Sequence, residues 1–240
     1  MWGREIAEAY DASVASRFEP QDVEPTVETL AELAGDGRAL ELAIGTGRIA
    51  LPLAAAGVEV HGIELSPHMV EQLCAKPGGT DVPVTIGDMA STRAVDDFAL
   101  VYLVFNTITN VTTQPEQVAV FRNAAGHLES GGRFVVEVGV PRFDRVPLGE
   151  SRQVFAMEDD HVGVESFDDP VGQISWSHHW WDVEGRLVRH SAPYRYVWPS
   201  ELDLMAQLAG LTLEHRWADW SGSEFTADSP SHVSVWHTPG

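Results

Sequence analysis

A short apolar stretch that runs into two glycines constrains this chain more than any other feature. Residues 39–50 read Ala-Leu-Glu-Leu-Ala-Ile-Gly-Thr-Gly-Arg-Ile-Ala. The pattern predicts a buried strand over residues 39–44, a tight turn from Gly45 to Gly47 and a helix over residues 48–56. Glycines suit a turn where the backbone bends sharply and a ligand approaches closer than a Cβ atom would allow. The stretch therefore predicts a nucleotide-binding strand–turn–helix.

An acidic residue follows the second predicted strand, which covers residues 58–63. Glu64 stands at the end of this strand, where a carboxylate can accept hydrogen bonds from both hydroxyls of a ribose. Each such charge-assisted bond contributes roughly 1.5–3 kcal/mol. An acid at this place can therefore decide which ligand binds.

Three linked elements carry a resemblance to a known family. The pattern Glu41-x-Ala43-x-Gly45-x-Gly47, then Glu64, then Gly87-Asp88-Met89 after the next predicted strand, resembles the cofactor site of class I S-adenosylmethionine-dependent methyltransferases of the small-molecule type. The family usually has glycine where this chain has Ala43. The resemblance covers residues 39–138 well and the tail from Tyr196 less specifically.

The resemblance implies S-adenosylmethionine as cofactor and S-adenosylhomocysteine as product. In the family, the acid at the position of Glu41 orders the loop around the methionine end of the cofactor, and the acid at the position of Asp88 binds the adenine amine. The residues expected to contact the cofactor are Tyr10, Arg17, Glu41, Ala43, Gly45, Gly47, Arg48, Glu64, Leu65, Met69, Asp88, Met89 and Phe105.

Two other classes of protein use the same kind of turn. Gly45-x-Gly47-x-x-Ala50 also fits an NAD(P)-dependent oxidoreductase. Glu41 argues against that class because an acid inside a strand is costly to bury without a partner, and a dehydrogenase has no comparable need for Asp88. The third class is a non-catalytic module that binds the cofactor and methylates nothing.

The order of predicted elements indicates an α/β fold. With 240 residues and 44% hydrophobic content, one domain with an insertion is the economical arrangement. Alternating strands and helices up to residue 138 predict a Rossmann-like, seven-stranded, doubly wound sheet with helices on both faces. Further strands are expected at residues 83–86, 99–104, 132–138, 211–217 and 232–236, and further helices at residues 67–75, 115–128 and 199–209. Gly131 and Gly132 are expected to separate the helix over residues 115–128 from its following strand.

Three regions follow from this reading. Residues 1–36 are expected to form a helical lid, residues 37–140 and 199–240 the methyltransferase core, and residues 141–198 an inserted antiparallel β-sheet. The lid is expected to hold helices over residues 3–18 and 22–33, separated by residues 19–21. It resembles the flexible amino-terminal lid of small-molecule methyltransferases, in which Tyr10 would touch the methionine portion of the cofactor and Arg17 its carboxylate. An ordinary packing helix is the alternative.

The insertion reads as β-strands over residues 153–157, 162–167, 174–182 and 187–198. In position and character it resembles the sheets of amino-sugar N-methyltransferases and glycine N-methyltransferase-like enzymes, which roof the acceptor pocket, pair with a second subunit, or both. Trp176, His178 and Trp180 should share one face, with His179 and Trp181 on the other. Tyr194, Tyr196 and Trp198 form another same-face set. Aromatic faces suit a flat or cationic acceptor, a dimer interface or a plain sheet core.

Three residues are candidates for catalysis. His178 and His179 are the candidate general bases, and because neighbouring residues on a strand point apart, they do not form one metal site. Asn106 follows the predicted strand 99–104, at a place that often lines the transfer site in the family, and it is a candidate for orienting the acceptor. Asparagine after a strand is also a common turn residue.

Charge narrows the possible partners. The chain carries 36 acidic against 15 basic residues, a net charge of −21, and Lys76 is its only lysine. Such a field repels phosphate backbones and anionic membranes, so neither nucleic acid nor membrane is an expected partner.

The lone cysteine, Cys74, excludes an internal disulfide and is expected to be buried. No signal peptide or spanning segment is seen, and a cytoplasmic protein is expected.

The expected reaction is attack by a nitrogen or oxygen atom of a small-molecule acceptor on the sulfonium methyl group, in line with the leaving S-adenosylhomocysteine. Because the cofactor is already activated, the protein mainly positions the reactants, which can supply roughly 7–11 kcal/mol. A general base is needed only for a hydroxyl or a protonated amine. The inserted sheet could also pair with that of a second copy, which would give a homodimer.

Overall fold

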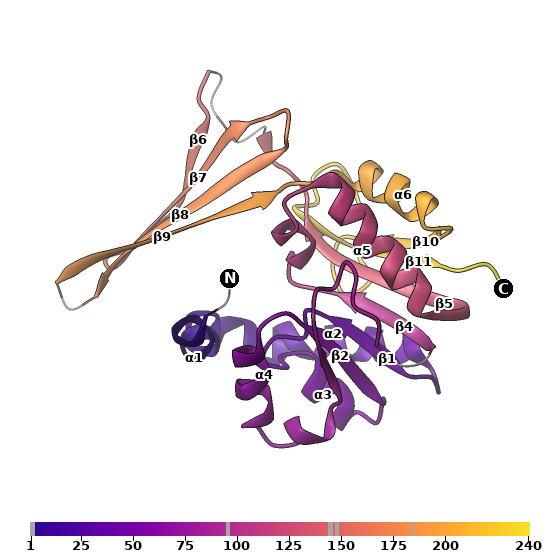
Figure 1. The fold of residues 1–240 in the computed structure, drawn as a ribbon. Helices are drawn as coiled ribbons and strands as arrows, with labels where there is room; N and C mark the ends of the chain where they lie inside the picture. The colour runs from indigo at the N-terminus through magenta and orange to yellow at the C-terminus, as the bar shows by residue number, and fades with distance from the viewer. Residues whose placement is uncertain (1–2, 95–96, 144–145, 147–148, 184) are drawn as a thin grey trace.

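The computed structural model describes residues 3–94, 97–143, 146, 149–183 and 185–240. Its core is a seven-stranded sheet in the order β10-β11-β5-β4-β1-β2-β3 (Figure 1). The strands are β1 (Ala39–Leu42), β2 (Val60–Glu64), β3 (Val84–Ile86), β4 (Phe98–Leu103), β5 (Leu128–Gly139), β10 (Thr212–Trp217) and β11 (Ser231–His237). The Rossmann-like α/β fold expected from the alternation of strands and helices is confirmed.

The strand order places a topological switch point between β1 and β4. β1 pairs in parallel with β2 on one side and with β4 on the other, so the chain reverses its direction of winding between β1 and β4. β11 pairs antiparallel with both β5 and β10. In open parallel sheets, ligands bind outside the carboxyl ends of the strands at such a reversal.

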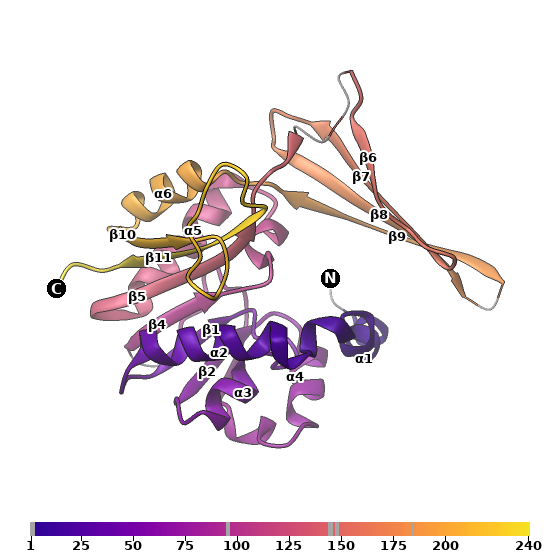
Figure 2. The same cartoon turned by 180° about the vertical axis from the view of Figure 1, so that it is seen from behind.

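Helices cover both faces of the core sheet (Figures 1 and 2). They are α2 (Pro20–Ala34), α3 (Ala50–Ala55), α4 (Pro67–Cys74), α5 (Gln114–His127) and α6 (Pro199–Leu208). α2 and α3 pack on the face that carries Leu100, Tyr102 and Val135. α5 and α6 pack on the opposite face, where Phe121 meets Phe134 and Trp236 at ring distances of 5.0 and 5.4 Å.

A four-stranded antiparallel sheet is inserted between β5 and α6, in the order β6-β7-β8-β9. Its strands are β6 (Arg152–Met157), β7 (His161–Asp169), β8 (Ile174–Val183) and β9 (Arg186–Arg195). Both views show it standing out from the core on the side of α1 (Arg4–Ser13) (Figures 1 and 2). The expected inserted sheet is confirmed.

One buried arginine anchors the root of the inserted sheet. Arg195, the last residue of β9, is 3% exposed. Its guanidinium donates to Glu201 at the start of α6 at 2.6 Å and to Gln173 before β8 at 2.7 Å, and also to Gln117 on α5. A single cation thus joins the sheet to two helices of the core.

Several boundaries differ from the sequence-based expectation. β1 ends at Leu42 instead of residue 44 because Ala43 takes a positive φ of 53°. α3 begins at Ala50 instead of residue 48, since Arg48 and Ile49 still belong to the turn. Pro20 opens α2 instead of separating two helices, as its fixed φ favours the first turn. The first expected helix is split into α1 and the 3₁₀ helix η1 (Ala15–Phe18).

Three further expectations were wrong. α5 ends at His127 and β5 begins at Leu128, so Gly131 and Gly132 lie inside the strand at a register shift with β4 instead of before it. β9 ends at Arg195, so Tyr196 and Trp198 do not extend its same-face set. Cys74 is exposed at the end of α4. Its position on an apolar stripe did not reveal that the last turn faces solvent.

Candidate active site

The glycine turn after β1 is tightly packed. A Cβ atom at Gly47, whose φ is 81°, would lie 3.0 Å from Leu51 Cγ and 3.2 Å from Leu73 Cδ1. Gly45 has a φ of 59°, and Ala43 has a similar φ of 53°. Glycine adopts this left-handed region freely and alanine does so at a cost of roughly 1–2 kcal/mol. The residue where the family usually has glycine thus keeps the glycine conformation.

Glu64 ties the end of β2 to this turn. Its Oε2 accepts the Gly45 backbone N–H at 3.0 Å, and its Oε1 accepts the Ser66 backbone N–H at 2.8 Å. The side chain is buried, with 5% exposure. Burial raises the pKa of Glu64, and the backbone N–H groups of Ser66, Gly45 and Leu65 oppose that shift. The two carboxylate oxygens together offer about four lone-pair sites, so these three N–H groups leave one site that could accept from a ribose hydroxyl.

Glu41 is enclosed beneath the turn. The Tyr102 hydroxyl on β4 donates to its Oε2 at 2.9 Å, and the Ala50 backbone N–H at the start of α3 also donates to it. Burial raises the pKa of Glu41 to about 8, against the opposing effects of Tyr102, Arg48 and Ala50. The hydrogen bonds from the Tyr102 hydroxyl and from the Ala50 N–H at the start of α3 stabilise the buried carboxylate, and protonation removes its charge in part of the molecules.

The buried acid predicts a pH dependence of stability. The folded-state pKa of Glu41 lies near 8, against about 4.5 for a glutamate in water, so between these values the folded protein holds a proton that the unfolded chain loses. Stability is then greatest below the unfolded value and falls as pH rises toward 8, by a few kcal/mol at most. Glu41→Gln keeps the shape and removes this titration. Urea unfolding between pH 6.5 and 8.5 should show a declining free energy for the native protein and a nearly flat one for the variant, whereas equal slopes would refute the assignment.

The amino-terminal segment lies against the turn. Burial raises the pKa of Tyr10, with Arg48 opposing and the carboxylates of Asp11, Glu41 and Glu64 adding to the rise. The Arg48 guanidinium donates to the Arg17 carbonyl oxygen at 3.2 Å.

Two guanidinium groups meet on the ring of Phe105. The Cζ atom of Arg48 lies 4.8 Å from the ring centroid and that of Arg17 lies 5.9 Å from it. Phe105 follows β4, so these contacts join the amino-terminal segment, the glycine turn and the end of β4 at one place.

The remaining expected cofactor residues surround the same edge. Asp88 is exposed beyond β3, and its Oδ1 accepts the Ala90 backbone N–H at 2.8 Å. Leu65 is 57% exposed directly after Glu64. Met69 is buried in the first turn of α4, and Met89 packs from the side on the core. Asp88 thus caps its own turn through Oδ1.

The turn after β4 has a strained backbone and is held in place by two hydrogen bonds. Phe105 and Asn106 both have a φ of 59°, a conformation that costs non-glycine residues energy and concentrates at functional sites. Glu137 on β5 holds the turn, since its Oε2 accepts the Phe105 backbone N–H at 2.8 Å. The Asn106 Oδ1 accepts the Gly139 backbone N–H at 2.6 Å. The side-chain oxygen of Asn106 is therefore occupied by a backbone N–H group, and only its side-chain N–H groups can bind another partner.

The two candidate histidines lie on opposite faces of the inserted sheet, as expected. His178 stacks beside Trp176 at 6.3 Å and hydrogen-bonds Ser191 at 2.8 Å. His179 stacks on Trp181 at 4.9 Å and hydrogen-bonds His161 at 2.9 Å. Burial lowers the pKa of His179. Within the described part of the chain, no hydrogen bond or ring contact joins either histidine to the residues of the carboxyl edge.

Sequence reasoning missed three participants. Tyr102 is hidden in a uniformly apolar strand, Glu137 lies in a strand of valines, and Lys76 follows α4 with no motif around it. Their partners Glu41, Phe105 and Asp11 lie 61, 32 and 65 positions away. No local pattern marks such pairs.

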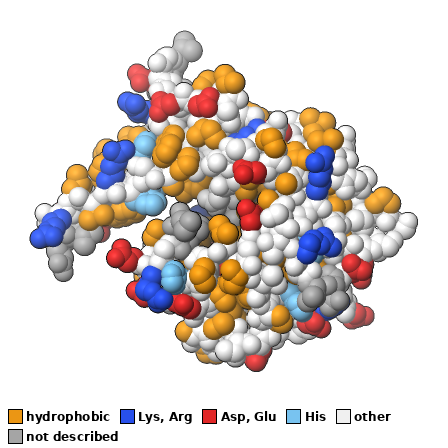
Figure 3. All heavy atoms as spheres, in the orientation of Figure 1, with side chains coloured by type: hydrophobic (Ala, Val, Ile, Leu, Met, Phe, Trp, Pro, Cys, Tyr) orange, Lys and Arg blue, Asp and Glu red, His pale blue; other side chains and the backbone are white. Residues whose placement is uncertain are grey.

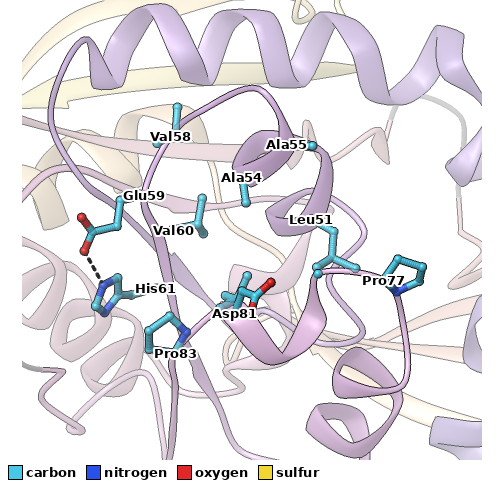
Figure 4. Close-up of a pocket in the computed structure, with 12 residues that line it drawn as sticks. Leu51, Ala54, Ala55, Val58, Glu59, Val60, His61, Pro77, Asp81 and Pro83 are labelled. Atoms are coloured by element: carbon cyan, nitrogen blue, oxygen red, sulfur yellow. Dashed lines mark hydrogen bonds and ion pairs between the residues drawn. The ribbon is translucent and has the colours of Figure 1, made fainter.

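A separate hollow lies beside the amino-terminal half of β2 (Figure 4). It encloses about 540 Å³. Glu59 and His61 face one another there at 3.0 Å, and the other walls are largely alanine, valine, leucine and proline. None of the expected cofactor residues lines it. The carboxyl edge of the sheet therefore remains the candidate site.

Comparison with known proteins gives the class. The family model described as "Methyltransferase domain" matches residues 39–132, which span β1 to the first part of β5. The chain is also 36% identical to the CcbJ methyltransferase of Streptomyces caelestis, a solved structure, with a TM-score of 0.87 over 100% of this chain and 98% of that one. The chain belongs to the S-adenosylmethionine-dependent methyltransferases, and S-adenosylmethionine is its cofactor.

Two other similar proteins carry more specific names. The cypemycin N-terminal methyltransferase of a Streptomyces species is 29% identical over 205 residues, 83% of each chain. The amino pentose methyltransferase CalS10 of Micromonospora echinaspora, solved with the cofactor bound, shares the fold with 21% identity and a TM-score of 0.72 over 95% of each chain. The comparisons give no support to an oxidoreductase. Among the described residues, no helix is long and apolar enough to cross a membrane, and no group of acids, histidines or cysteine could hold a metal ion.

Proposed function

We propose that this enzyme transfers a methyl group to an amine nitrogen of a small-molecule or peptide acceptor. The observation that carries the proposal is the carboxylate of Glu137 beside the strained turn after β4. Its Oε2 is engaged by Phe105, while its Oε1 has no partner among the described residues and is not sealed from solvent. A free carboxylate oxygen next to Asn106 suits an ammonium group.

Two further facts support an amine. The net charge of −21 attracts cationic molecules and repels anionic ones. The relative that methylates the amino terminus of cypemycin, by its name, covers 83% of this chain. Methylation of an oxygen atom would need a stronger base than the residues around Asn106 offer, and His178 and His179 are then the candidates.

The roles proposed for the cofactor residues follow from their contacts. Glu64 binds the ribose through its free lone-pair site, and Asp88 binds the adenine amine through the oxygen that does not cap its turn. Tyr10, Arg17 and Arg48 border the methionine end, which Glu41 supports from below. The backbone at Ala43, Gly45 and Gly47 and the side chains of Leu65, Met69, Met89 and Phe105 complete the surface.

S-adenosylmethionine supplies a methyl group already activated on sulfur. The chain therefore has to hold the acceptor nitrogen in line with that methyl group and exclude water, and positioning of this kind is worth up to roughly 7–11 kcal/mol. An amine attacks only when neutral, so its ammonium form must first lose a proton. Glu137 holds the amine and lies where it can accept that proton, and Asn106 orients the nitrogen through its amide.

The inserted sheet is proposed as the roof of the acceptor site and as a dimer contact. Figure 3 shows a recess between the arm formed by this sheet and the core below it. Both faces of the sheet expose apolar side chains, among them Phe155 at 46%, Met157 at 76% and Leu187 at 75%. Light scattering on the purified protein tests the dimer, which a monomeric mass at micromolar concentration would rule out.

Residues 1–36 are proposed as the lid. The protein is proposed to work in the cytoplasm, where its single cysteine stays reduced.

The acceptor class can be tested with methyl-labelled S-adenosylmethionine. The enzyme would be incubated with metabolite extract and with peptides that carry either a free or an acetylated amino terminus. Label is expected on compounds with a free amine and not on their acetylated forms, and mass spectrometry would place the added methyl on nitrogen. Label found only on compounds that lack a basic amine would contradict the proposal.

A charge-neutral variant tests Glu137 separately. Glu137→Gln keeps an oxygen to accept the Phe105 N–H but loses the charge. Its KM for the amine acceptor should rise at least tenfold while its affinity for S-adenosylhomocysteine stays unchanged. An unchanged KM would leave Glu137 with only its clamping role.

A further inference from the structure

The only lysine of the chain lies at the contact between the amino-terminal segment and the glycine turn. Lys76 Nζ donates to Asp11 Oδ2 on α1 at 2.5 Å and to the Thr46 carbonyl oxygen at 2.8 Å. The Thr46 hydroxyl donates to Asp11 Oδ1 at 2.6 Å. Lys76, Asp11 and Thr46 therefore form a closed ring of three contacts.

The ring joins three separate parts of the site. Asp11 belongs to α1, Thr46 stands between the two glycines of the turn, and Lys76 follows α4. Lys76 Nζ also lies 5.1 Å from the ring centroid of Phe18 in η1. A single ammonium group thus lies against α1, η1 and the backbone of the turn at once.

Partial burial makes these contacts stronger than ordinary surface pairs. The side chains of Lys76 and Asp11 are 25% and 38% exposed, and Thr46 is 1% exposed. Another ion pair between α1 and α4, from Arg4 to Glu71 at 3.0 Å, is 57% and 51% exposed. Exposed pairs of that kind contribute little because water and salt screen them. The chain therefore offers two ion pairs from α1, one half-buried with Lys76 just beyond α4 and one exposed with Glu71 on α4.

The neighbour of Asp11 connects the ring to the cofactor surface. Tyr10 precedes Asp11, and its phenol is largely buried, which raises its pKa, while the charges of Arg48, Glu41 and Glu64 also act on it. A lid held at Asp11 places Tyr10 over the turn, and a lid released at Asp11 withdraws it. A cofactor lying against the glycine turn is then covered by α1 for as long as the ring is intact.

We propose that Lys76 is a positioning residue that latches the amino-terminal lid onto the glycine turn, and that exchange of the cofactor requires this latch to open. The inference rests on the proposed cofactor surface and not on the identity of the acceptor. Breaking the latch speeds release of S-adenosylhomocysteine and leaves the fold intact, because Asp11 and Lys76 lie at the rim of the core and both reach water when the lid lifts.

The test measures the release rate of labelled S-adenosylhomocysteine during a chase with excess unlabelled ligand. Lys76→Met keeps the aliphatic stem and loses the charge, and Asp11→Asn keeps an acceptor for the Thr46 hydroxyl and loses the ion pair. Each is expected to release the ligand at least tenfold faster than the native protein, with an unchanged thermal midpoint. The double variant should be no faster than the faster single variant, because both changes open one latch. Lys76→Arg, which keeps the charge, should stay within about threefold of native.

Arg4→Met is the matched control, since it removes the exposed pair between α1 and α4. Its release rate should stay within about twofold of native. Native rates in both Lys76→Met and Asp11→Asn would overturn the latch, as would additive effects in the double variant or an equal acceleration by Arg4→Met. If Lys76→Met fails to fold, Asp11→Asn alone decides. A native protein that does not bind S-adenosylhomocysteine would overturn the cofactor surface itself, an outcome distinct from failure of the latch.

Discussion

Glu64→Ala is expected to weaken the binding of S-adenosylmethionine at least a hundredfold. The carboxylate accepts the backbone N–H groups of Gly45 and Ser66 and, with Leu65 also donating, has one lone-pair site left for a ribose. Charge-assisted bonds of this kind contribute roughly 1.5–3 kcal/mol each, and about 2.8 kcal/mol corresponds to a hundredfold change in affinity. Removal of the carboxylate also releases the glycine turn, so the affinity falls both because ligand contacts are lost and because the turn is no longer held in its binding conformation. Isothermal titration of the native protein and the variant measures the effect.

The control for this experiment is Glu59→Ala. Glu59 directly precedes β2 at its opposite end, its side chain is 63% exposed, and among the described residues its carboxylate pairs only with His61 and Arg38. Its removal should leave the affinity for S-adenosylmethionine within about twofold of native. Comparable losses in the two variants would mean that the acid at the carboxyl end of β2 has no special part in binding.

Arg195→Met is expected to destabilise the protein by about 3–5 kcal/mol, the range for breaking a buried ion pair from one side. The change leaves the carboxylate of Glu201 and the amide oxygens of Gln117 and Gln173 without their donor. Among the described residues, Glu201 then keeps only the amide donors of Gln114 and Gln173. Urea unfolding, followed by tryptophan fluorescence, measures the loss.

Arg186→Met provides the comparison, because Arg186 is an exposed residue at the first position of β9. It should change the free energy of unfolding by less than about 0.5 kcal/mol. If Arg195→Met changed the free energy of unfolding by as little, apolar contacts at the base of the inserted sheet, and not the arginine, would hold the sheet to the core.

The parts of the fold that depend on local pattern were predictable. Apolar runs broken by glycine turns fixed the order of strands and helices, and the acids Glu41, Glu64 and Asp88 marked the strand ends where the chain turns. Boundaries failed where tertiary contact overrides local preference. Ala43 leaves β1 in a conformation that its sequence does not announce, and Leu128 is drawn into β5 by pairing with Phe98 despite the two glycines that follow.

The partners of the site residues were not predictable. Glu41 needed a partner in order to be buried, yet nothing in a run of apolar residues singled out Tyr102 as that partner. Asn106 looked like a free amide, but Gly139 occupies its oxygen once β4 and β5 are paired. Lys76 meets Asp11 only because the lid folds back across the turn. Such contacts depend on the packed arrangement of elements distant in sequence.

A crystal structure of the protein with S-adenosylhomocysteine tests the central claim most directly. The ribose hydroxyls are expected on Glu64, the adenine amine on Asp88, and the sulfur directed toward Phe105 and Asn106, with α1 closed over the ligand through Asp11 and Lys76. A ligand bound elsewhere, or an adenosine oriented away from Glu64 and Asp88, would contradict the account.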